Sequence, residues 1–559
     1  MASRPFRLSA PLAVGVAVVL TCLAYSNSFE GEFVMDDQSE IEENPAMRTL
    51  LPPWRAMFVG NRMPARPLPY LTFAIDHALW GDDPFGYHLT NLAIHVGAAL
   101  ALFGLVRRSL LSPRLEGRYA DRATLLALII AAAWAVHPLQ TQAVTYVYQR
   151  IESLTGMLSL VALYAFARAS GAGYDRRWLA VCTVSTAAAM ASKESGVVLP
   201  LLIASYDWLL CGTGPTGFRT RRAFYAGLAS TWIILAVVLA SQAGRYGEFQ
   251  EPVHRPLPYL LTQPRVILHY LRLATIPSPL CFDYVWRTAE TVGEFLPSLC
   301  WLLVPFVATI VAATRARPAA WLGIVFFFAL APTSSIMPVV ALAAEHRMYL
   351  PLAAFVAAVV LACDLLVRRW PKGERLGRVA AGIAVAAACC WIATLSTMTH
   401  ARNAVYAMPG GIWQDVLSKQ LPSTRALWNL ARTCARYDRI DDALGYADEL
   451  AGMNPRLAIF RDLSEYRHDR GQRDQAVRIL RHGLSTLEGR LAANEPVRLE
   501  TAGYLAAYLH EDGSTAEAVA VIEQALADAE PLPASLEQRR AIADMRGLLA
   551  RITASSGGR

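Results

Sequence analysis

The 559-residue chain is 54% hydrophobic and only 17% charged, whereas soluble domains carry about a quarter charged residues. This composition excludes an ordinary soluble protein and, together with long apolar runs, indicates a polytopic membrane protein. The formal charge of +7 comes from short arginine clusters between apolar runs, which is typical of topology signals and argues against nucleic-acid binding. The nine cysteines show no CxxC or cysteine–histidine spacing, so neither a disulfide framework nor a zinc site is predicted.

Eleven apolar runs predict membrane-spanning helices, several of them near the short end for a bilayer crossing of about 20 residues. The first run follows Arg4 and Arg7 and is interpreted as an uncleaved signal anchor. The predicted spans are residues 10–27, 88–106, 123–139, 151–169, 178–192, 194–211, 223–241, 295–313, 318–334, 349–367 and 377–396.

Arginine clusters fall in every second connection, and the positive-inside rule places them in the cytoplasm. The N-terminus is then cytoplasmic, and everything after residue 398 lies on the other side. Dense arginine and alanine suggest a high-GC bacterium, so we expect the bacterial inner membrane with the C-terminal region in the periplasm. Residues 259–276 do not fit as a span, because Arg265, His269 and Arg272 form one charged stripe. They predict an amphipathic helix at the outer interface.

Five connections are predicted on this outer side: residues 28–87, 137–152, 192–195, 242–293 and 334–349. They hold nearly all the polar residues near membrane depth that are not topology signals: Asp36, Asp37, His137, Gln140, Gln149, Arg150, Glu152, Lys193, Glu194, Asp283, Glu345, His346 and Arg347. Ionisable residues at span ends are costly and are therefore functional candidates. Snorkelling to the interface explains any one of these residues. It does not readily explain why so many of them lie on the outer side.

The first outer loop contains seven carboxylates within residues 29–45. Two of them, Asp36 and Asp37, are adjacent and directly follow an apolar tripeptide. A carboxylate pair at the mouth of a membrane span can act as a base or hold a cation. A solvated acidic loop is the alternative interpretation.

After residue 398 the chain becomes charged and helix-forming. Three segments align, each with a turn residue five positions before an alanine that opens a helix, namely Ala443, Ala476 and Ala518. Amphipathic helices are predicted before them, at 424–437, 457–470 and 498–511, and a capping helix at 535–553. The spacing favours tetratricopeptide-type repeats over generic helical hairpins.

Six motifs occur in order along the chain. They are Phe33-Val-Met-Asp36-Asp37 with Asn44-Pro45; Arg66-Pro-Leu-Pro-Tyr-Leu-Thr72 leading to Tyr87-His88 and His95; His137-Pro-Leu-Gln continuing to Gln149-Arg150-Ile-Glu152; Ser192-Lys193-Glu194-Ser195; Cys281-Phe-Asp283-Tyr; and Glu345-His-Arg347-Met-Tyr349-Leu-Pro351. Together they resemble the transmembrane and tetratricopeptide repeat-containing protein O-mannosyltransferases and their bacterial relatives.

This resemblance implies an all-α polytopic protein of the GT-C type, with a glycosyltransferase domain at 1–398 and an extracytoplasmic repeat domain at 399–559. It implies a polyprenyl-phosphate sugar donor and an acidic catalytic base in the first outer loop, which falls on Asp36 or Asp37. One departure is Met35, where family members often carry histidine or tryptophan before the acidic pair.

Transfer to a hydroxyl requires a base and positive groups that stabilise the leaving phosphate. We assign Asp36 as the base and Asp37 as its orienter, with the reverse assignment open. The substrate-binding candidates are Arg150, Glu152, Lys193, Glu194, Glu345, His346 and Arg347. Arg347 is the first choice for the phosphate because guanidinium binds its oxygens bidentately. Lys193 and Glu194 are equally well explained as a local ion pair. No protein metal site or resident cofactor is predicted, although a requirement for a divalent cation is left as an alternative.

The predicted function is transfer of a mannose-like sugar from a polyprenyl phosphate to a hydroxyl, with Ser or Thr of an extracytoplasmic protein as acceptor. Membrane lipids and, through the repeats, the protein acceptor are the expected partners. A non-catalytic membrane scaffold that presents repeats is the main alternative, and a glycolipid or polysaccharide acceptor is another. A transporter fits less well, because its polar residues should lie at mid-membrane positions.

Overall fold

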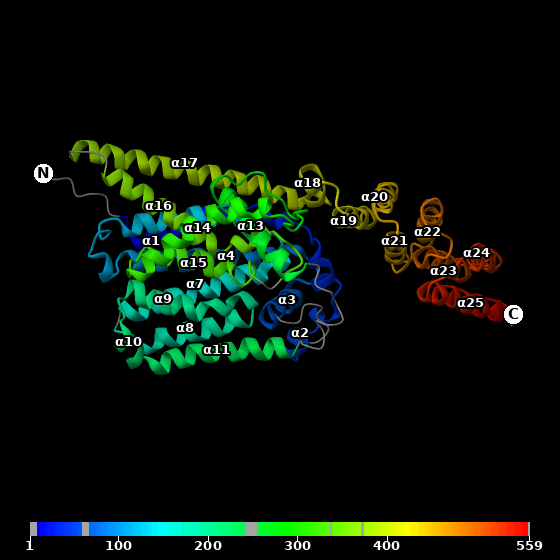
Figure 1. The fold of residues 1–559 in the computed structure, drawn as a ribbon, viewed down its shortest axis with the longest axis horizontal. Helices are drawn as coiled ribbons and strands as arrows, with labels where there is room; N and C mark the ends of the chain where they lie inside the picture. Colours follow the sequence, from blue (N-terminus) through cyan, green and yellow to red (C-terminus); the bar gives the residue numbers. More distant parts are fainter. Residues whose placement is uncertain are drawn as a thin grey trace. The chain divides into compact units, whose positions relative to one another are not determined.

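The computed structural model describes residues 8–58, 66–171, 173–241, 254–335, 338–369 and 374–556, and the regular structure in these ranges is entirely helical. The chain divides into two compact units, Met1–Met408 and Pro409–Arg559 (Figure 1). The all-α, polytopic membrane fold predicted from the sequence is confirmed, and the chain is an integral membrane protein. The predicted boundary at 398/399 lies within the last helix of the first unit, which continues to Ala407.

The helices of the membrane unit are α1 (Ala10–Ala24), α2 (Trp54–Phe58), α3 (Pro67–Trp80), α4 (Pro84–Leu110), α5 (Ala123–Ala135), α6 (Thr141–Val144), α7 (Arg150–Gly171), α8 (Arg176–Met190), α9 (Leu199–Leu210), α10 (Pro215–Thr220), α11 (Arg222–Ala240), α13 (Pro256–Thr275), α14 (Val292–Thr314), α15 (Ala320–Leu330), α16 (Pro351–Arg369) and α17 (Glu374–Ala407). Each predicted span overlaps one of these helices. Two helices, α2 and α3, lie within residues 28–87, which were expected to form a loop.

Seven segments of the described chain are long and apolar enough to cross a membrane: Ala10–Glu30, Pro84–Leu110, Val147–Gly171, Arg222–Ala240, Val292–Thr314, Pro351–Arg369 and Arg375–Ala407. An eighth crossing forms if Ala123–Ala135 and Pro138–Val144 count as one span bent by 53°. The bend lies at His137-Pro138, because proline disfavours a helical residue before it. The helices α8, α9 and α15 have only 15, 12 and 11 residues.

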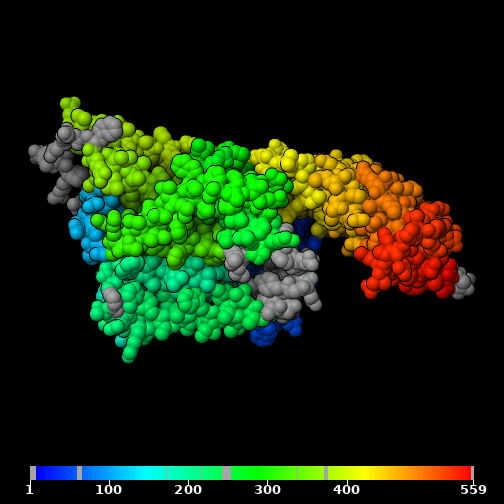
Figure 2. Space-filling view, viewed as in Figure 1, coloured from blue at the N-terminus to red at the C-terminus, as the bar shows by residue number. Residues whose placement is uncertain are grey.

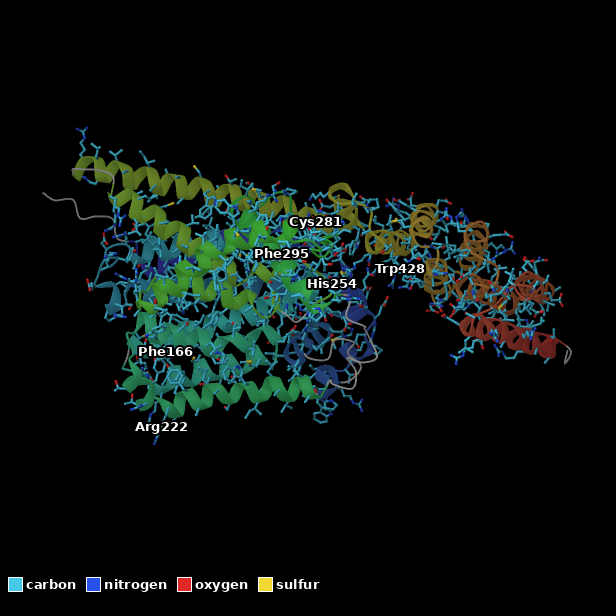
Figure 3. The ribbon with its side chains drawn as sticks, viewed as in Figure 1. Phe166, Arg222, His254, Cys281, Phe295 and Trp428 are labelled. Atoms are coloured by element: carbon cyan, nitrogen blue, oxygen red, sulfur yellow. The ribbon has the colours of Figure 1, made fainter. Side chains whose placement is uncertain are left out.

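The bundle packs closely around Tyr349, which precedes α16 and is completely buried. Its hydroxyl lies 2.9 Å from Nδ1 of His95 on α4, and its carbonyl accepts a 2.9 Å hydrogen bond from the indole of Trp134 on α5. Gly156 on α7 faces the same ring, and a Cβ atom there would lie 2.4 Å from it. A glycine is therefore required at 156 for α7 to approach this ring. At the edge of the bundle Arg222 points away from the helices (Figure 3).

Helix α13 has the amphipathic character expected of residues 259–276. It buries Tyr259, Val266, Tyr270 and other residues on one face, whereas Arg265 is exposed. The Arg265 guanidinium lies 4.9 Å from the ring centroid of Trp286, in a cation–π contact. Helix α13 is not among the segments apolar enough to span a membrane.

The second unit consists of α18 (Gly411–Lys419), α19 (Thr424–Arg436), α20 (Ile440–Met453), α21 (Ile459–His468), α22 (Arg473–Glu488), α23 (Pro496–Glu511), α24 (Thr515–Ala529) and α25 (Leu536–Ser556). Helices α19 to α24 form three successive antiparallel hairpins, and α25 packs on the last one. In the space-filling view these helices follow one another in chain order, from yellow to red (Figure 2).

Each hairpin turns at the residue that the sequence alignment singled out. Asp438, Gly471 and Gly513 have φ values of +63°, +75° and +85°, the left-handed conformation that ends many helices. Five residues later Ala443, Ala476 and Ala518 are completely buried. Only a small side chain fits where the two helices of a hairpin approach, which explains the repeated alanine.

Candidate functional site

The acidic segment after α1 folds into a short, irregular helix. Met35 has a φ of +49° and ends an extended stretch. Asp36 and Asp37 form the first turn, and Gln38–Glu42 continue it as a π-helix. Such π-turns are rare and are frequent at functional sites. The strained backbone at Met35 therefore sets the direction in which the two carboxylates point.

Asp37 is completely buried. One carboxylate oxygen accepts a 2.9 Å hydrogen bond from the backbone N–H of Val34, and the other a 2.6 Å bond from the N–H of Tyr148. Burial raises the pKa of the Asp37 carboxyl well above its usual range, and the charge of Asp36 adds to this, while the backbone hydrogen bonds oppose it. Asp37 thus joins the acidic segment to the turn Val147–Gln149 before α7, which favours a positioning role.

Asp36 is partly exposed. Its backbone N–H donates a 3.1 Å hydrogen bond to the hydroxyl of Tyr146, whose side chain is buried. Burial and the charges of Asp36 and Asp37 raise the pKa of Tyr146 well above its usual value, so this hydroxyl keeps its proton. Of the two aspartates, Asp36 is the one that solvent reaches, which favours it as the base.

A third carboxylate of the acidic segment, Glu40, connects it to α3. Glu40 is buried, and its carboxylate accepts a 2.5 Å hydrogen bond from the Tyr70 hydroxyl on α3. That hydroxyl lies 3.3 Å from the hydroxyl of Tyr148, whose backbone binds Asp37. Sequence reasoning did not select Glu40 or Tyr70 as site residues. The signal for Tyr70 was its place in the proline-rich motif at 66–72.

Positive side chains gather around His346, which lies in the short 3₁₀ turn Glu345–Met348 before α16. Lys193, Arg347 and Arg66 all lie within electrostatic range of its ring. Burial, followed by these three charges, lowers the pKa of His346 well below its usual value, so the ring is neutral at pH 7. Its backbone N–H donates a 2.9 Å hydrogen bond to the Gln142 side chain. Arg66, which begins the motif at 66–72 but was not predicted as a site residue, belongs to this cluster.

The candidates Glu152 and Lys193 meet directly. The Lys193 ammonium lies 2.5 Å from the Glu152 carboxylate, and both residues are buried. Glu194 instead faces Arg66, at 3.6 Å. Each of the two residues thus pairs with a residue distant in sequence rather than with its neighbour, and a substrate-binding role for them stays a prediction.

Two other candidates, Arg347 and Glu345, are held mainly by backbone groups. The Arg347 guanidinium donates to the carbonyls of Leu342 and Ala341, at 3.1 and 2.5 Å. The Glu345 carboxylate accepts from the Cys281 backbone and the Tyr284 hydroxyl, at 2.6 and 2.7 Å. These contacts fix the loops around α13 and favour structural roles for both residues.

Arg150 is completely buried at the start of α7. It forms a 2.5 Å ion pair with Asp76 of α3 and hydrogen bonds to Asn91, to Thr72 and to the Tyr87 carbonyl. Its guanidinium also lies 4.7 Å from the ring centroid of Phe73. Arg150 therefore joins α3, α4 and α7, and this arrangement favours a structural role over contact with a phosphate.

The described part of the chain contains no group of three or more histidine, cysteine, aspartate or glutamate side chains that could hold a metal ion. His88 and His95, both on α4, face different partners: Nε2 of His88 lies 3.0 Å from the Gly31 carbonyl, and Nε2 of His95 lies 2.9 Å from the Ala135 carbonyl. Both histidines therefore serve packing between α4 and its neighbours.

Taken together, the chain is an integral membrane protein that collects a carboxylate pair and a cluster of cations at one end of its helical bundle. Its curated relatives are consistent with that class. It is 31% identical to the human protein O-mannosyl-transferase TMTC4 over 227 residues, which cover 36% of this chain and 30% of that protein. It is 25% identical over 516 residues to Tmtc3 of Drosophila melanogaster, covering 77% of this chain and 54% of the relative.

Human TMTC3 is 27% identical over 322 residues, covering 50% of this chain and 33% of that protein. These matches confirm the resemblance to the TMTC protein O-mannosyltransferases that the motifs predicted. The chain spans about half the length, or less, of these curated relatives. No protein-family model matches the chain, and no solved structure is significantly similar to it.

Proposed function

We propose that this protein is a membrane glycosyltransferase of the GT-C type that transfers a mannose-like sugar from a polyprenyl phosphate to a protein hydroxyl. The observation that carries the proposal is the pair Asp36 and Asp37, one partly exposed and one fixed by two backbone hydrogen bonds. A buried partner that holds an exposed carboxylate in place suits a general base. We propose a mannose-like sugar because the relatives are named as O-mannosyl-transferases.

The proposed reaction begins when a carboxylate oxygen of Asp36 takes the proton of the acceptor hydroxyl. The hydroxyl oxygen then bonds to the first carbon of the sugar, and the bond from that carbon to the phosphate oxygen breaks. The phosphate leaves with the electron pair. Arg66 and Lys193, near neutral His346, are our candidates for stabilising its charge. Glu152 holds Lys193 in place and is available to a sugar hydroxyl.

We further propose that the second unit recruits the protein acceptor. Stacked helical hairpins bind extended peptides or proteins along their surface. Tethering such a module to a catalytic unit raises the local acceptor concentration, to the millimolar range for short linkers. The proposed location is a bacterial inner membrane, with a cytoplasmic N-terminus and periplasmic repeats, as the arginine clusters predict.

Two other functions compete with this proposal. A scaffold needs the repeats but has no use for a carboxylate pair beside clustered cations. A glycosyltransferase that acts on a glycolipid or polysaccharide needs the same site but has less use for a protein-binding module. Activity on purified acceptors of the three kinds separates these functions.

The test uses full-length protein in lipid nanodiscs with a radiolabelled polyprenyl-phosphate mannose and an extract of periplasmic proteins. Asp36→Asn is expected to abolish transfer while the protein still folds. Glu43→Gln is the matched control, since Glu43 is an exposed carboxylate of the same segment. Equal transfer by Asp36→Asn and wild type would remove Asp36 as the base.

A further inference from the structure

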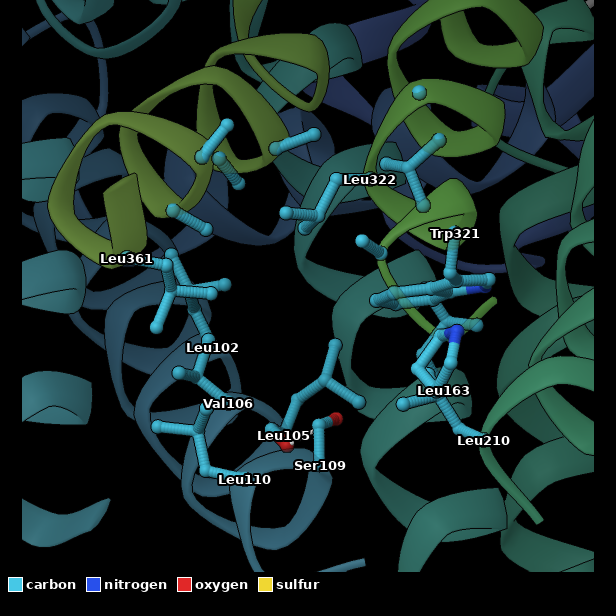
Figure 4. Close-up of a pocket in the computed structure, with 18 of the residues that line it drawn as sticks. Leu102, Leu105, Val106, Ser109, Leu110, Leu163, Leu210, Trp321, Leu322 and Leu361 are labelled. Carbon is cyan, nitrogen blue, oxygen red and sulfur yellow. Dashed lines mark hydrogen bonds between the residues drawn. The ribbon is translucent and has the colours of Figure 1, made fainter. Parts of the chain in front are cut away.

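An apolar cavity of about 410 Å³ lies within the membrane unit, among α4, α7, α15 and α16. Figure 4 shows Leu102 and Leu361 on one side of the open space and Trp321 and Leu163 on the other. Engineered cavities of about 150 Å³ already bind benzene. The volume therefore suits a hydrocarbon several times larger than benzene.

The cavity is elongated. Its end at Leu350 is four residues from His346, but most of the cavity lies away from the candidate site. Along α16 it is lined from Leu350 to Leu365, a length of about 22 Å at 1.5 Å per residue. On α4 it is lined by residues 102–110, whereas the site contacts of α4 are made near His88 and Asn91. Leu105 is thus about 25 Å along the helix from His88. The cavity belongs mainly to the opposite half of the bundle.

The cavity opens on the outer surface of the bundle. Ala319, Ala358 and Ala362 line it and are exposed, so the opening lies between α15 and α16. In a membrane unit this surface faces lipid. A hydrocarbon chain can therefore enter sideways from the bilayer without crossing water.

Positive charge lies at the end of the cavity where α4 ends. Arg118 precedes the lining residue Tyr119, and Arg317 precedes the lining residue Pro318. Both arginines are exposed, and within the described residues neither forms a recorded ion pair. By the positive-inside rule this is the cytoplasmic side, where arginines near the surface attract anionic lipid headgroups.

We propose that this cavity binds one acyl chain of an anionic phospholipid of the cytoplasmic leaflet, whose phosphate is held by Arg118 and Arg317. The site is separate from the proposed transfer reaction and does not depend on it. A bound chain fills the space between α15 and α16 and so stabilises the short helix α15.

The test uses the full-length protein in detergent and the fluorescence of Trp321, taken as the difference between wild type and Trp321→Phe. Phospholipids with brominated acyl chains quench tryptophan on contact. Brominated phosphatidylglycerol is expected to quench Trp321 at lower concentration than phosphatidylcholine with the same chains. The paired variant Arg118→Gln/Arg317→Gln should weaken the phosphatidylglycerol effect roughly tenfold or more.

Matched variants distinguish a specific site from general effects. Ala358→Phe narrows the cavity and should abolish quenching, whereas Ala386→Phe, at an exposed alanine of α17 outside the cavity, should not. Arg176→Gln/Arg222→Gln removes the same charge from exposed arginines elsewhere and should leave quenching unchanged. Equal quenching by both lipids on the wild-type protein would overturn the proposal, as would complete relief by polyprenyl phosphate, which would assign the cavity to the donor instead.

Discussion

The ion pair between Arg150 and Asp76 allows a direct test of whether Arg150 has a structural or a substrate-binding role. Arg150 was predicted to contact the substrate, yet the two side chains are buried at 0% and 4% exposure with 2.5 Å between them. Removing one partner of a buried pair leaves an uncompensated charge and costs about 3–5 kcal/mol. Arg150→Gln should therefore lower the melting temperature by several degrees.

A double-mutant cycle measures the coupling. Asp76→Asn alone leaves the Arg150 charge without its partner, and its cost should be of the same order. The double variant removes both charges, so its loss should be clearly smaller than the sum of the single losses. Thermal unfolding in detergent, followed by intrinsic fluorescence, supplies the four values. Arg176→Gln, at an exposed arginine, is the control and should stay within about 0.5 kcal/mol of wild type.

Arg150→Gln that melts like wild type and instead raises the donor KM would contradict a structural role for Arg150. That outcome would mean that Arg150 reaches the substrate in a conformation different from the one described.

Three further predictions rest on other contacts. Asp37→Asn should lower the melting temperature, because an amide cannot accept both backbone N–H groups that the carboxylate accepts. Since burial raises the folded pKa of Asp37, the wild type loses stability as pH rises from the unfolded pKa to the folded one. The stability gap to Asp37→Asn should therefore narrow as pH rises, and a widening gap would contradict the sign. Glu152→Gln should destabilise the protein more than Glu152→Gln/Lys193→Met does, and additive losses in calorimetry would exclude a coupled pair. Truncation after Met408 should abolish transfer to whole proteins but retain it on a short peptide at high concentration, and equal activity on whole proteins would reject recruitment by the repeats.

The helices could be predicted because their signals are local. Long apolar runs marked the spans, and the recurring turn residue and alanine marked each hairpin of the second unit. The left-handed turns at Asp438, Gly471 and Gly513 are the physical origin of that recurring pattern. The short helix α3 was missed because its prolines and Asp76 resemble a loop, although proline is well tolerated in the first turn of a helix.

The partners within the site could not be predicted, since they depend on contacts between distant segments. Lys193 and Glu194 are adjacent, which suggested a local pair. The backbone at Lys193 is extended, with φ of −157° and ψ of 147°, and successive side chains of an extended backbone point to opposite sides. Lys193 consequently meets Glu152, and Glu194 meets Arg66.

The most direct test of the central claim is a transfer assay with purified full-length protein in nanodiscs, given a polyprenyl-phosphate mannose labelled in the sugar. We expect label on Ser or Thr of a periplasmic protein acceptor, located by mass spectrometry, with wild type and Glu43→Gln but not with Asp36→Asn. Transfer that survives Asp36→Asn, or label found only on lipid or polysaccharide, would contradict it.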